Sequence, residues 1–405
     1  MKELFSLGSL YVSDFIKEDT TAELYDLTLV LQEDGNVKLK NSVPLDTMFG
    51  RYWYRSGVTN TMRDELQNVV QEILKVYKKD PELWIDIACN DGTLLSNVPK
   101  TITTIGIDPA DNSFLIESSK HADLIIQDYF TADAFKKSKF GHKRADVITT
   151  IAMFYDLVDP DAFIKDVCEV LSDDGLWVIQ LSYTPLMIKQ LAFDNICHEH
   201  VYYYSLFNIM DVMERNGMKI VDCQFNDING GSMRLFMQKE KYDSSNFGTQ
   251  PYRDVCDYRI ASALKYEESQ NLADPLTWQN FYSDVLNLKQ KTVDFIRDEK
   301  NKGKTIWGYG ASTKGNTLLQ FFGLDNTLLD GIAERSTYKY GLKTIGSNIP
   351  IYSEEEMRAA KPDYLLILPW HFISEFTKRE KTYLDSGGKF IVPCPEFKII
   401  SAGGA

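Results

Sequence analysis

Apolar and polar residues follow two different periods along this chain, and the changes between them predict its organisation. Residues 1–61 contain short alternating pieces such as ELYDLTLVLQEDG, which favour short strands. From Met62 to Lys78 the apolar residues recur every three to four positions, as on one face of a helix. The chain is therefore expected to begin with a small mixed segment that leads into an amphipathic helix.

A run of alternating strands and helices follows. Five apolar, β-branched segments have the composition of buried strands, and helical stretches separate most of them: LWIDIA, TTIGID, DLIIQD, ADVITTIAMF and GLWVIQLSY. Such alternation is typical of a parallel sheet with helices on both faces. After a helix near Leu206 to Asn216, the turn-rich NDINGG joins the strands KIVDCQF and GSMRLFMQK, which predicts an antiparallel hairpin that closes the sheet.

The last third of the chain changes pattern twice. Residues 251–302 are predicted to form helices with a break at Pro275. Residues 303–405 are predicted to form a second, smaller α/β unit with the strands KTIWGYG, LLDGIAE, YLLILPW and KFIVPCP. We therefore predict four units: an N-terminal segment (1–61), a large α/β domain (62–250), a helical connector (251–302) and a C-terminal α/β domain (303–405).

Composition narrows the classes of partner. The chain has 405 residues, 44% of them hydrophobic and 25% charged, which is ordinary for a globular protein of two or three domains. No apolar run reaches the roughly 18 residues of a membrane helix, and MKELFSLGSL lacks the features of a signal peptide. We expect a cytoplasmic protein, a monomer or a small homo-oligomer, with no membrane partner.

The net charge and the spacing of the cysteines further limit the partners and the kinds of site that are expected. A net charge of -14 argues against nucleic acid as the main partner, although backbone amides and a few local cations can still hold an anionic small ligand. The six cysteines contain no CxxC pair, and the closest two, Cys197 and Cys223, are about 26 positions apart. This spacing indicates neither a zinc knuckle nor a disulfide framework.

The first strand of the large domain ends in DIACNDGTLL, from Asp86 to Leu95. A turn of small residues between a strand and a helix lets a ligand approach the backbone amides, although an ordinary corner of the fold has the same composition. The turn differs from the dinucleotide pattern GxGxxG, because Ala88 and Asn90 occupy the first two glycine positions. The third small position is Gly92.

Acidic residues end the next two strands on the same edge of the predicted sheet. Asp108, about 20 residues after the turn, can accept both hydroxyls of a ribose, and Asp128 can accept from an exocyclic amine. Met153 and Phe154, at the end of the fourth strand, can flank the ligand. Any one of these acids could be a solvated cap, but their shared position favours a nucleoside site. Its candidate residues are Asp86, Ala88, Asn90, Gly92, Asp108, Asp128, Met153 and Phe154.

The segment FDNICHEHVYYYSL, from Phe193 to Leu206, holds two of the five histidines of the chain together with a glutamate, a cysteine and three tyrosines. These side chains can serve packing, because imidazole and phenol groups combine apolar bodies with polar tips. They can also serve proton transfer, since the segment follows the fifth strand at the predicted binding edge and imidazole titrates near neutral pH.

The strand order with its closing hairpin, the turn DIACNDGTLL and Asp108 resemble the class I S-adenosylmethionine (SAM) dependent methyltransferases. The motifs DNICHEHVYYYSL, NDINGGSMR and WGYGASTKGNTLL resemble the sugar C-methyltransferases that act on nucleotide-linked keto-deoxysugars. The resemblance covers roughly Leu39 to Pro395. It implies a seven-stranded Rossmann-like sheet with a smaller Rossmann-like domain, SAM as cofactor and a nucleotide-diphosphate sugar as substrate.

The resemblance also implies roles in C-methylation, in which a carbon beside a ketone loses a proton to give a nucleophilic enolate. It assigns the base to His200, with Glu199 assisting. His198, Tyr202, Tyr203 and Tyr204 are candidates for hydrogen bonds to the keto oxygen. A metal held by His198 and His200 would need a third protein ligand, and only Cys197 is near in sequence, so we predict no metal.

Two departures from the family pattern keep alternatives open. The usual four-cysteine zinc module is absent, with Gln32 and Gly35 near the expected second pair, so no zinc is expected and residues 1–61 are predicted to form a lid-like segment. The segment AMFYDLVDP has Tyr155 and Asp156 where many relatives carry asparagine and histidine. An O- or N-methyltransferase, or a ligand-binding relative without activity, therefore remains an alternative.

Further substrate contacts follow from the resemblance, each beside a structural alternative. Tyr52, Tyr54, Ser56 and Thr59 are predicted to cover the site, or to make aromatic core contacts. The motif GYGASTKG places Gly308, Gly310, Ser312 and Lys314 as a phosphate cradle. Asn229 and Arg234 belong to the hairpin, where Arg234 either reaches a diphosphate or pairs with an acid. Four residues at strand ends complete the candidates: Glu334, Arg335, Trp370 and His371.

Overall fold

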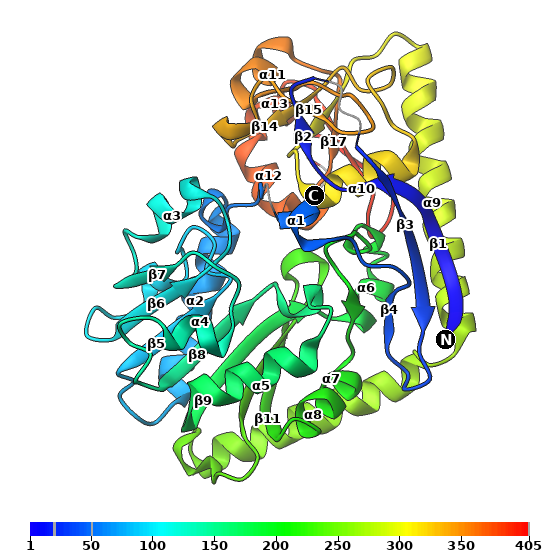
Figure 1. The fold of residues 1–405 in the computed structure, drawn as a ribbon. Coiled ribbons are helices and arrows are strands. Elements are labelled where there is room, and N and C mark those ends of the chain that lie inside the picture. The colour runs from blue at the N-terminus through cyan, green and yellow to red at the C-terminus, as the bar shows by residue number, and fades with distance from the viewer. Residues whose placement is uncertain (19–21, 50–51, 404–405) are drawn as a thin grey trace.

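The computed structural model of this protein describes residues 1–18, 22–49 and 52–403. Three main sheets make up the molecule: a seven-stranded sheet, a six-stranded sheet and a four-stranded sheet. Figure 1 shows the seven-stranded sheet in one lobe, the six-stranded sheet in a second lobe, and the N-terminal strands running between them beside a long helix. None of the helices in the described ranges has the length and apolar character that crossing a membrane requires.

The seven-stranded sheet has the order β11-β12-β9-β8-β5-β6-β7. The pairs from β9 to β7 are parallel, whereas β12 pairs antiparallel with both β9 and β11. This order confirms the predicted class I methyltransferase sheet with its closing hairpin. Its strands are β5 (Leu83–Ile87), β6 (Thr103–Ile107), β7 (Leu124–Ile126), β8 (Ala145–Ile151), β9 (Leu171–Ser182), β11 (Met218–Asn226) and β12 (Ser232–Lys239).

The parallel strands of this sheet are mostly buried because helices cover both faces. In β5, Trp84 packs with the core on one face and Ile85 with the core on the other. The first core includes the apolar face of α2 (Asn60–Val76), and the second includes α5 (Pro160–Val170) and α7 (Leu206–Glu214). Shorter helices complete this lobe: α3 (Asn112–Ser118), α4 (Ala132–Lys136) and α6 (Thr184–Lys189).

Two long helices, α8 (Gln250–Gln270) and α9 (Pro275–Asn301), lead to the C-terminal lobe. Its sheet has the order β16-β14-β13-β17-β18-β19, parallel except for the edge strand β19. The strands are β13 (Ile306–Tyr309), β14 (Gly331–Glu334), β16 (Ile351–Ser353), β17 (Tyr364–Ile367), β18 (Lys389–Val392) and β19 (Lys398–Ile400), and the helices are α10 (Thr313–Phe322), α11 (Glu354–Ala360), α12 (Ile373–Arg379) and α13 (Lys381–Asp385). The division of the chain into four units, drawn from the sequence, stays a proposal.

The N-terminal residues form a sheet of their own with β1 (Lys2–Tyr11), β3 (Leu24–Leu31) and β4 (Val37–Leu39). Its fourth strand, β10 (Tyr202–Tyr203), comes from the histidine-rich segment. The apolar side chains of this sheet share one core with α9 and the C-terminal lobe. The sequence predicted short strands here, but not their pairing with a segment about 160 residues away.

Two further contacts attach the N-terminal segment to the C-terminal lobe. The short strand β2 (Phe15–Ile16) pairs with β15 (Lys343–Thr344). The side chain of Gln320, on α10, accepts a hydrogen bond from the backbone N–H of Tyr11 at 2.9 Å and donates one to its carbonyl at 3.2 Å. The short helix α1 (Leu45–Phe49) then leads the chain toward the seven-stranded sheet.

Candidate active site

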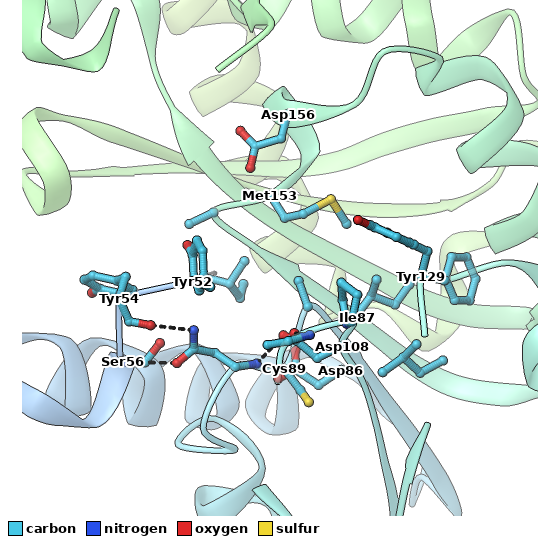
Figure 2. Close-up of a pocket in the computed structure, with 18 of the residues that line it drawn as sticks. Tyr52, Tyr54, Ser56, Asp86, Ile87, Cys89, Asp108, Tyr129, Met153 and Asp156 are labelled. Carbon is cyan, nitrogen blue, oxygen red and sulfur yellow. Dashed lines mark hydrogen bonds between the residues drawn. The ribbon is translucent and has the colours of Figure 1, made fainter. Parts of the chain in front are cut away.

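A cavity of about 430 Å³ opens at the carboxyl ends of β5, β6, β7 and β8. Parallel strands of an open sheet place such crevices at this edge, where the connections to the helices diverge. Ala88 and Asn90 follow β5, Asp108 follows β6, and Met153 follows β8 (Figure 2). The walls are mostly apolar, with a few carboxylates and tyrosines, as is usual for a small-molecule site.

The turn after β5, which lines the cavity, has an unusual backbone. Ala88 and Asn90 both have positive φ values, of 57° and 52°. Asp108 holds this turn: its Oδ2 accepts from the N–H of Asn90 and its Oδ1 accepts from the N–H of Ala110, both at 2.8 Å. Gly92 has a φ of 79°, and a Cβ there would lie 2.9 Å from the Cα of Ser118, so glycine is required.

Burial raises the pKa of two carboxyls at the base of this cavity. The side chain of Asp86 is 3% exposed, and burial raises its pKa to about 7, although the hydroxyl of Thr149 donates to its Oδ1 at 2.6 Å. Burial also raises the pKa of Asp108, while the two amides that it accepts from lower it. Burial therefore disfavours the charged form of both carboxyls.

Only some of the residues predicted for the nucleoside site line the cavity. Asp86, Ala88, Asn90, Asp108 and Met153 line the cavity. Gly92, Asp128 and Phe154 do not appear in its walls. Asp128 is exposed and accepts from the N–H of Tyr129, and Phe154 is fully buried against other aromatic rings. Sequence reasoning missed the lining residues Tyr129 and Phe130, although they directly follow the predicted strand end at Asp128.

The segment before α2 covers the turn. The amide of Asn90 donates from Nδ2 to the carbonyl of Tyr54 at 2.9 Å, and its Oδ1 accepts from the N–H of Ser56 at 3.1 Å (Figure 2). Tyr52, Tyr54 and Ser56 line the cavity, whereas Thr59 caps α2 by accepting from Met62. The buried hydroxyl of Tyr54 has no hydrogen-bond partner in the described ranges of the chain.

A second cluster of titratable groups adjoins this cavity. Asp156 lines the cavity, and its carboxyl interacts with that of Glu199 in the histidine-rich segment. Burial raises the pKa of Glu199 to about 7 and raises that of Asp156 well above its usual range. Tyr52 interacts with the carboxylates of both Asp108 and Glu199, so it connects the turn after β5 to the histidine-rich segment.

The two histidines of this segment lie in different surroundings. The ring of His200 is 4.1 Å from the ring of Tyr155 between centroids, and burial lowers its pKa well below the usual range. The imidazole of His200 is therefore neutral at neutral pH. The Nε2 of His198 lies 3.1 Å from the carbonyl oxygen of Tyr25 in the N-terminal sheet. That contact directs His198 away from the cluster, in contrast to its predicted role at the keto oxygen.

The C-terminal lobe contributes a cation to the cluster. The ammonium of Lys314 donates a hydrogen bond to the side-chain carbonyl of Asn195. Burial lowers the pKa of Lys314, and the carboxyls of Asp194, Glu199 and Asp156 oppose this effect. His371 is also buried here, and burial lowers its pKa to about 3.

Other predicted substrate residues have structural partners. Ser312 caps α10 by accepting from Gly315 N–H at 2.9 Å, and Gly310 N–H donates to the carbonyl of Ala333 at 2.8 Å. Trp370 donates to Asp194 at 3.1 Å. The guanidinium of Arg234 is 2% exposed and bonds to Glu65, Asn68 and Gln180, which favours the alternative in which Arg234 pairs with an acid.

Tyr202 and Tyr203 form β10, and Asn229, at the hairpin turn, lines the cavity. Of the remaining strand-end candidates, Glu334 accepts from the N–H of Arg335 at 2.8 Å.

Several buried polar atoms in this region have no hydrogen-bond partner among the described residues. They are Tyr54 OH, Asp156 Oδ1, Asp194 Oδ1, Asn195 Nδ2 and Tyr203 OH. Buried polar groups are nearly always paired, so a group of unpaired ones is typical of a place that holds a polar ligand.

The histidine-rich segment also brings three metal-ligating side chains together. The ligand atoms of Cys197, Glu199 and His200 lie within 4.8 Å of one another, whereas His198 is outside this group. The positive charge of Lys314 acts on all three. A cation so close disfavours a second one, and the prediction of no metal stays a prediction.

Comparisons with known proteins agree with this architecture. Residues 58–222 match the family model of a methyltransferase domain, and residues 227–395 match that of a C-methyltransferase C-terminal domain. C-methyltransferase NovU from Streptomyces niveus is 29% identical over 366 residues, which are 90% of this chain and 84% of NovU.

Two solved methyltransferase structures are similar to part of the chain. The plantazolicin methyltransferase BpumL, in complex with a triazolic desmethylPZN analog and SAH, is 15% identical, with a TM-score of 0.36 over 45% of this chain and 86% of that one. Magnesium protoporphyrin IX methyltransferase (ChlM) from Synechocystis PCC 6803 with bound SAM is 10% identical, with a TM-score of 0.33 over 44% and 79%.

The strand order of the large sheet and the match over residues 58–222 define a class I SAM-dependent methyltransferase. Together the two family models cover both lobes, and the second model describes the domain that accompanies C-methyltransferases. These matches and the similarity to NovU support a SAM-dependent C-methyltransferase, in agreement with the resemblance of the motifs.

Proposed function

We propose that this enzyme methylates a carbon beside the ketone of a nucleotide-linked deoxysugar, with His200 as the base. The observation that carries this proposal is the position of Asp156 and Glu199: Asp156 lines the cavity, and the ligand atoms of Glu199 and His200 lie within 4.8 Å of each other. The buried imidazole of His200, which would accept the proton, therefore lies close to a carboxyl group next to the cofactor cavity.

The cavity fits SAM in its chemistry. Its volume falls within the roughly 300–1,000 Å³ that small-molecule sites span. Each oxygen of Asp108 accepts one amide and keeps a lone pair for a ribose hydroxyl. Met153 and Ile107 would face the adenine, and the unpaired hydroxyl of Tyr54 is available to a polar ligand. When bound, SAM supplies an electrophilic methyl group and leaves as S-adenosylhomocysteine.

The residues of the cluster divide the proton chemistry among them. His200 is neutral, so its ring nitrogen can take the proton from the carbon beside the ketone, and the C–H electron pair passes into an enolate. The imidazolium that forms is buried, which is costly unless negative charge compensates it. Burial raises the pKa of the neighbouring Glu199 to about 7, and its ionised form would supply that charge.

The test is a mass-spectrometric screen with SAM and a panel of nucleotide-linked keto-deoxysugars, run in heavy water. We expect a methyl group on carbon and deuterium at the carbon beside the ketone, both lost in His200→Ala. His142→Ala, which removes an exposed histidine, is the matched control and should leave both unchanged.

Other outcomes of the same screen decide between the alternatives. A methyl group on oxygen or nitrogen without deuterium exchange would show that the acceptor is that atom and not carbon. This is the O- or N-methyltransferase alternative, which the departure from the family pattern at Tyr155 and Asp156 left open. Tight SAM binding with no turnover on the whole panel would indicate a relative that binds its ligand without catalysis. The cytoplasmic location and the oligomeric state expected from the sequence stay predictions.

A further inference from the structure

Lys314 belongs to the C-terminal lobe but extends into the cluster of the other lobe. It is the second residue of α10, and its ammonium donates to the side chain of Asn195 at the end of the short helical turn Phe193–Asn195. The ring of Phe193 stacks on that of Phe322 with centroids 5.1 Å apart, which fixes α10 against this turn. The contact with Asn195 is therefore built into the packing of the two lobes.

The turn that carries Lys314 is not an open phosphate cradle. The N–H of Ala311 donates to the carboxylate of Glu334 at 2.7 Å, and the hydroxyl of Ser312 accepts within its own helix. Lys339 fills the same corner, because its ammonium donates to the carbonyl of Ala311 at 2.7 Å. With these groups taken up by the protein, the predicted role of Lys314 in holding a nucleotide diphosphate loses its support.

The charges around Lys314 indicate another role. The positive charge of Lys314, whose ammonium donates to Asn195, acts on Asp156, Glu199 and His200. Unpaired polar atoms of Asp156 and Asn195 lie in the same cluster, so a ligand with polar groups would reach this ammonium. Removing a proton beside a ketone places negative charge on the ketone oxygen, and a positioned cation stabilises that charge most in a buried site.

We propose that Lys314 is a catalytic residue whose ammonium binds the ketone oxygen of the acceptor and stabilises the enolate that forms there. The proton leaves carbon for His200, and negative charge develops on the oxygen beside Lys314. The enolate carbon would then form the C–C bond to the methyl group as the methyl–sulfur bond breaks, the sulfur keeping that electron pair in S-adenosylhomocysteine, and the ketone is restored. This role rests on the proposed C-methylation. It makes the C-terminal lobe part of the catalytic machinery.

The experiment measures deuterium exchange beside the ketone and methyl transfer separately, with the full-length enzyme. Lys314→Met should lower both rates about 10²- to 10³-fold, while the Kd for SAM stays within about twofold. Lys314→Arg should retain part of the exchange because it keeps the charge. Lys289→Met is the matched control: Lys289 also contacts α10, but at the opposite end, through the carbonyl of Phe321.

Two results would contradict the proposals in different ways, and a second variant covers the case in which the first does not fold. If Lys314→Met exchanges deuterium at the wild-type rate and only KM rises, Lys314 binds the substrate without stabilising the enolate, and this inference is overturned. If the wild-type enzyme neither exchanges nor methylates any keto-sugar, the proposed function fails and the role of Lys314 with it. Should Lys314→Met not fold, Lys314→Gln, which keeps a donor for Asn195, gives the same comparison.

Discussion

At the scale of single residues, the carboxyls of the site are buried before any ligand arrives. Asp86 is nearly inaccessible, with the hydroxyl of Thr149 as its hydrogen-bond donor. Trp84 donates to the same hydroxyl at 3.1 Å. Burial is the largest influence on the pKa of Asp86, and it favours the protonated form.

This burial predicts a pH-dependent cost in stability. The pKa of Asp86 is about 7 in the folded state and about 3.9 in an unfolded chain, so the folded state binds more protons between these values. Its contribution to the free energy of unfolding therefore falls as pH rises from about 4 to about 7 and stays low above that. Asp86→Asn keeps an acceptor for Thr149 and should raise the melting midpoint at pH 8 but not at pH 4.

Melting curves of both proteins across this pH range provide the check. The gain at pH 8 should correspond to roughly 1–3 kcal/mol, after allowing for relaxation around the carboxyl. A difference between variant and wild type that does not change with pH would show that Asp86 is ionised in the folded state. SAM affinity, measured separately, reports on the cofactor role of the same residue.

At the scale of elements, the histidine-rich segment is an edge strand as well as a catalytic loop. Its strand β10 pairs with β4, and the backbone N–H of Leu39 donates to the carbonyl of Val201 at 2.9 Å. The contact from His198 to the carbonyl of Tyr25 adds a side-chain tie to the same sheet. The N-terminal sheet thus holds the histidine-rich segment on both sides of Glu199 and His200, through His198 before them and Val201 and β10 after them.

We predict that His198 positions this segment without touching the substrate. His198→Ala should lower kcat about 10-fold, because a small displacement of the neighbouring base costs much of the rate, and should leave the Kd for SAM unchanged. His198→Gln, which keeps a donor, should recover part of the loss. Tyr25→Phe retains the backbone carbonyl and the ring, so it should behave as wild type. An unchanged kcat in His198→Ala would mean that the strand pairing alone fixes the segment.

At the scale of the whole molecule, the N-terminal residues, for which the sequence predicts no zinc, form a sheet that packs against the rest of the chain. Phe15, Leu27 and Leu29 are fully buried in a core that the sheet shares with α9 and the C-terminal lobe. Apolar burial of this kind contributes on the order of 1.5–3 kcal/mol for each large side chain. The sheet is therefore expected to be stable through packing, without a metal.

Treatment with EDTA followed by dialysis should leave both the melting midpoint and the turnover unchanged. Added zinc should not raise either quantity. A loss of activity that zinc restores would contradict this prediction, and would instead indicate a metal at Cys197, Glu199 and His200, whose ligand atoms lie close enough together to hold one.

Much of the fold and part of the site could be predicted from the sequence, because they depend on local rules. Apolar segments separated by helical stretches specify a parallel sheet, and NDINGG specifies the closing hairpin. Strand ends of a parallel sheet meet at one edge, so the turn at Asp86 and the acid at Asp108 were expected to lie together, and both line the cavity. Asp128 was expected at the same edge, but it is exposed and is not among the residues that line the cavity, since one residue decides whether a side chain faces the cavity or the solvent.

Tertiary structure alone decided how the segments combine. His198 and His200 are two residues apart, yet one contacts the N-terminal sheet and the other joins the carboxyl cluster. Lys314 meets Asn195 across 119 positions of sequence. Such contacts depend on the packing of whole lobes and on the direction of each side chain, and neither is encoded in a short stretch of residues. The sequence by itself determined which groups are present and on which sheet edge; the packing determined which of them share one site.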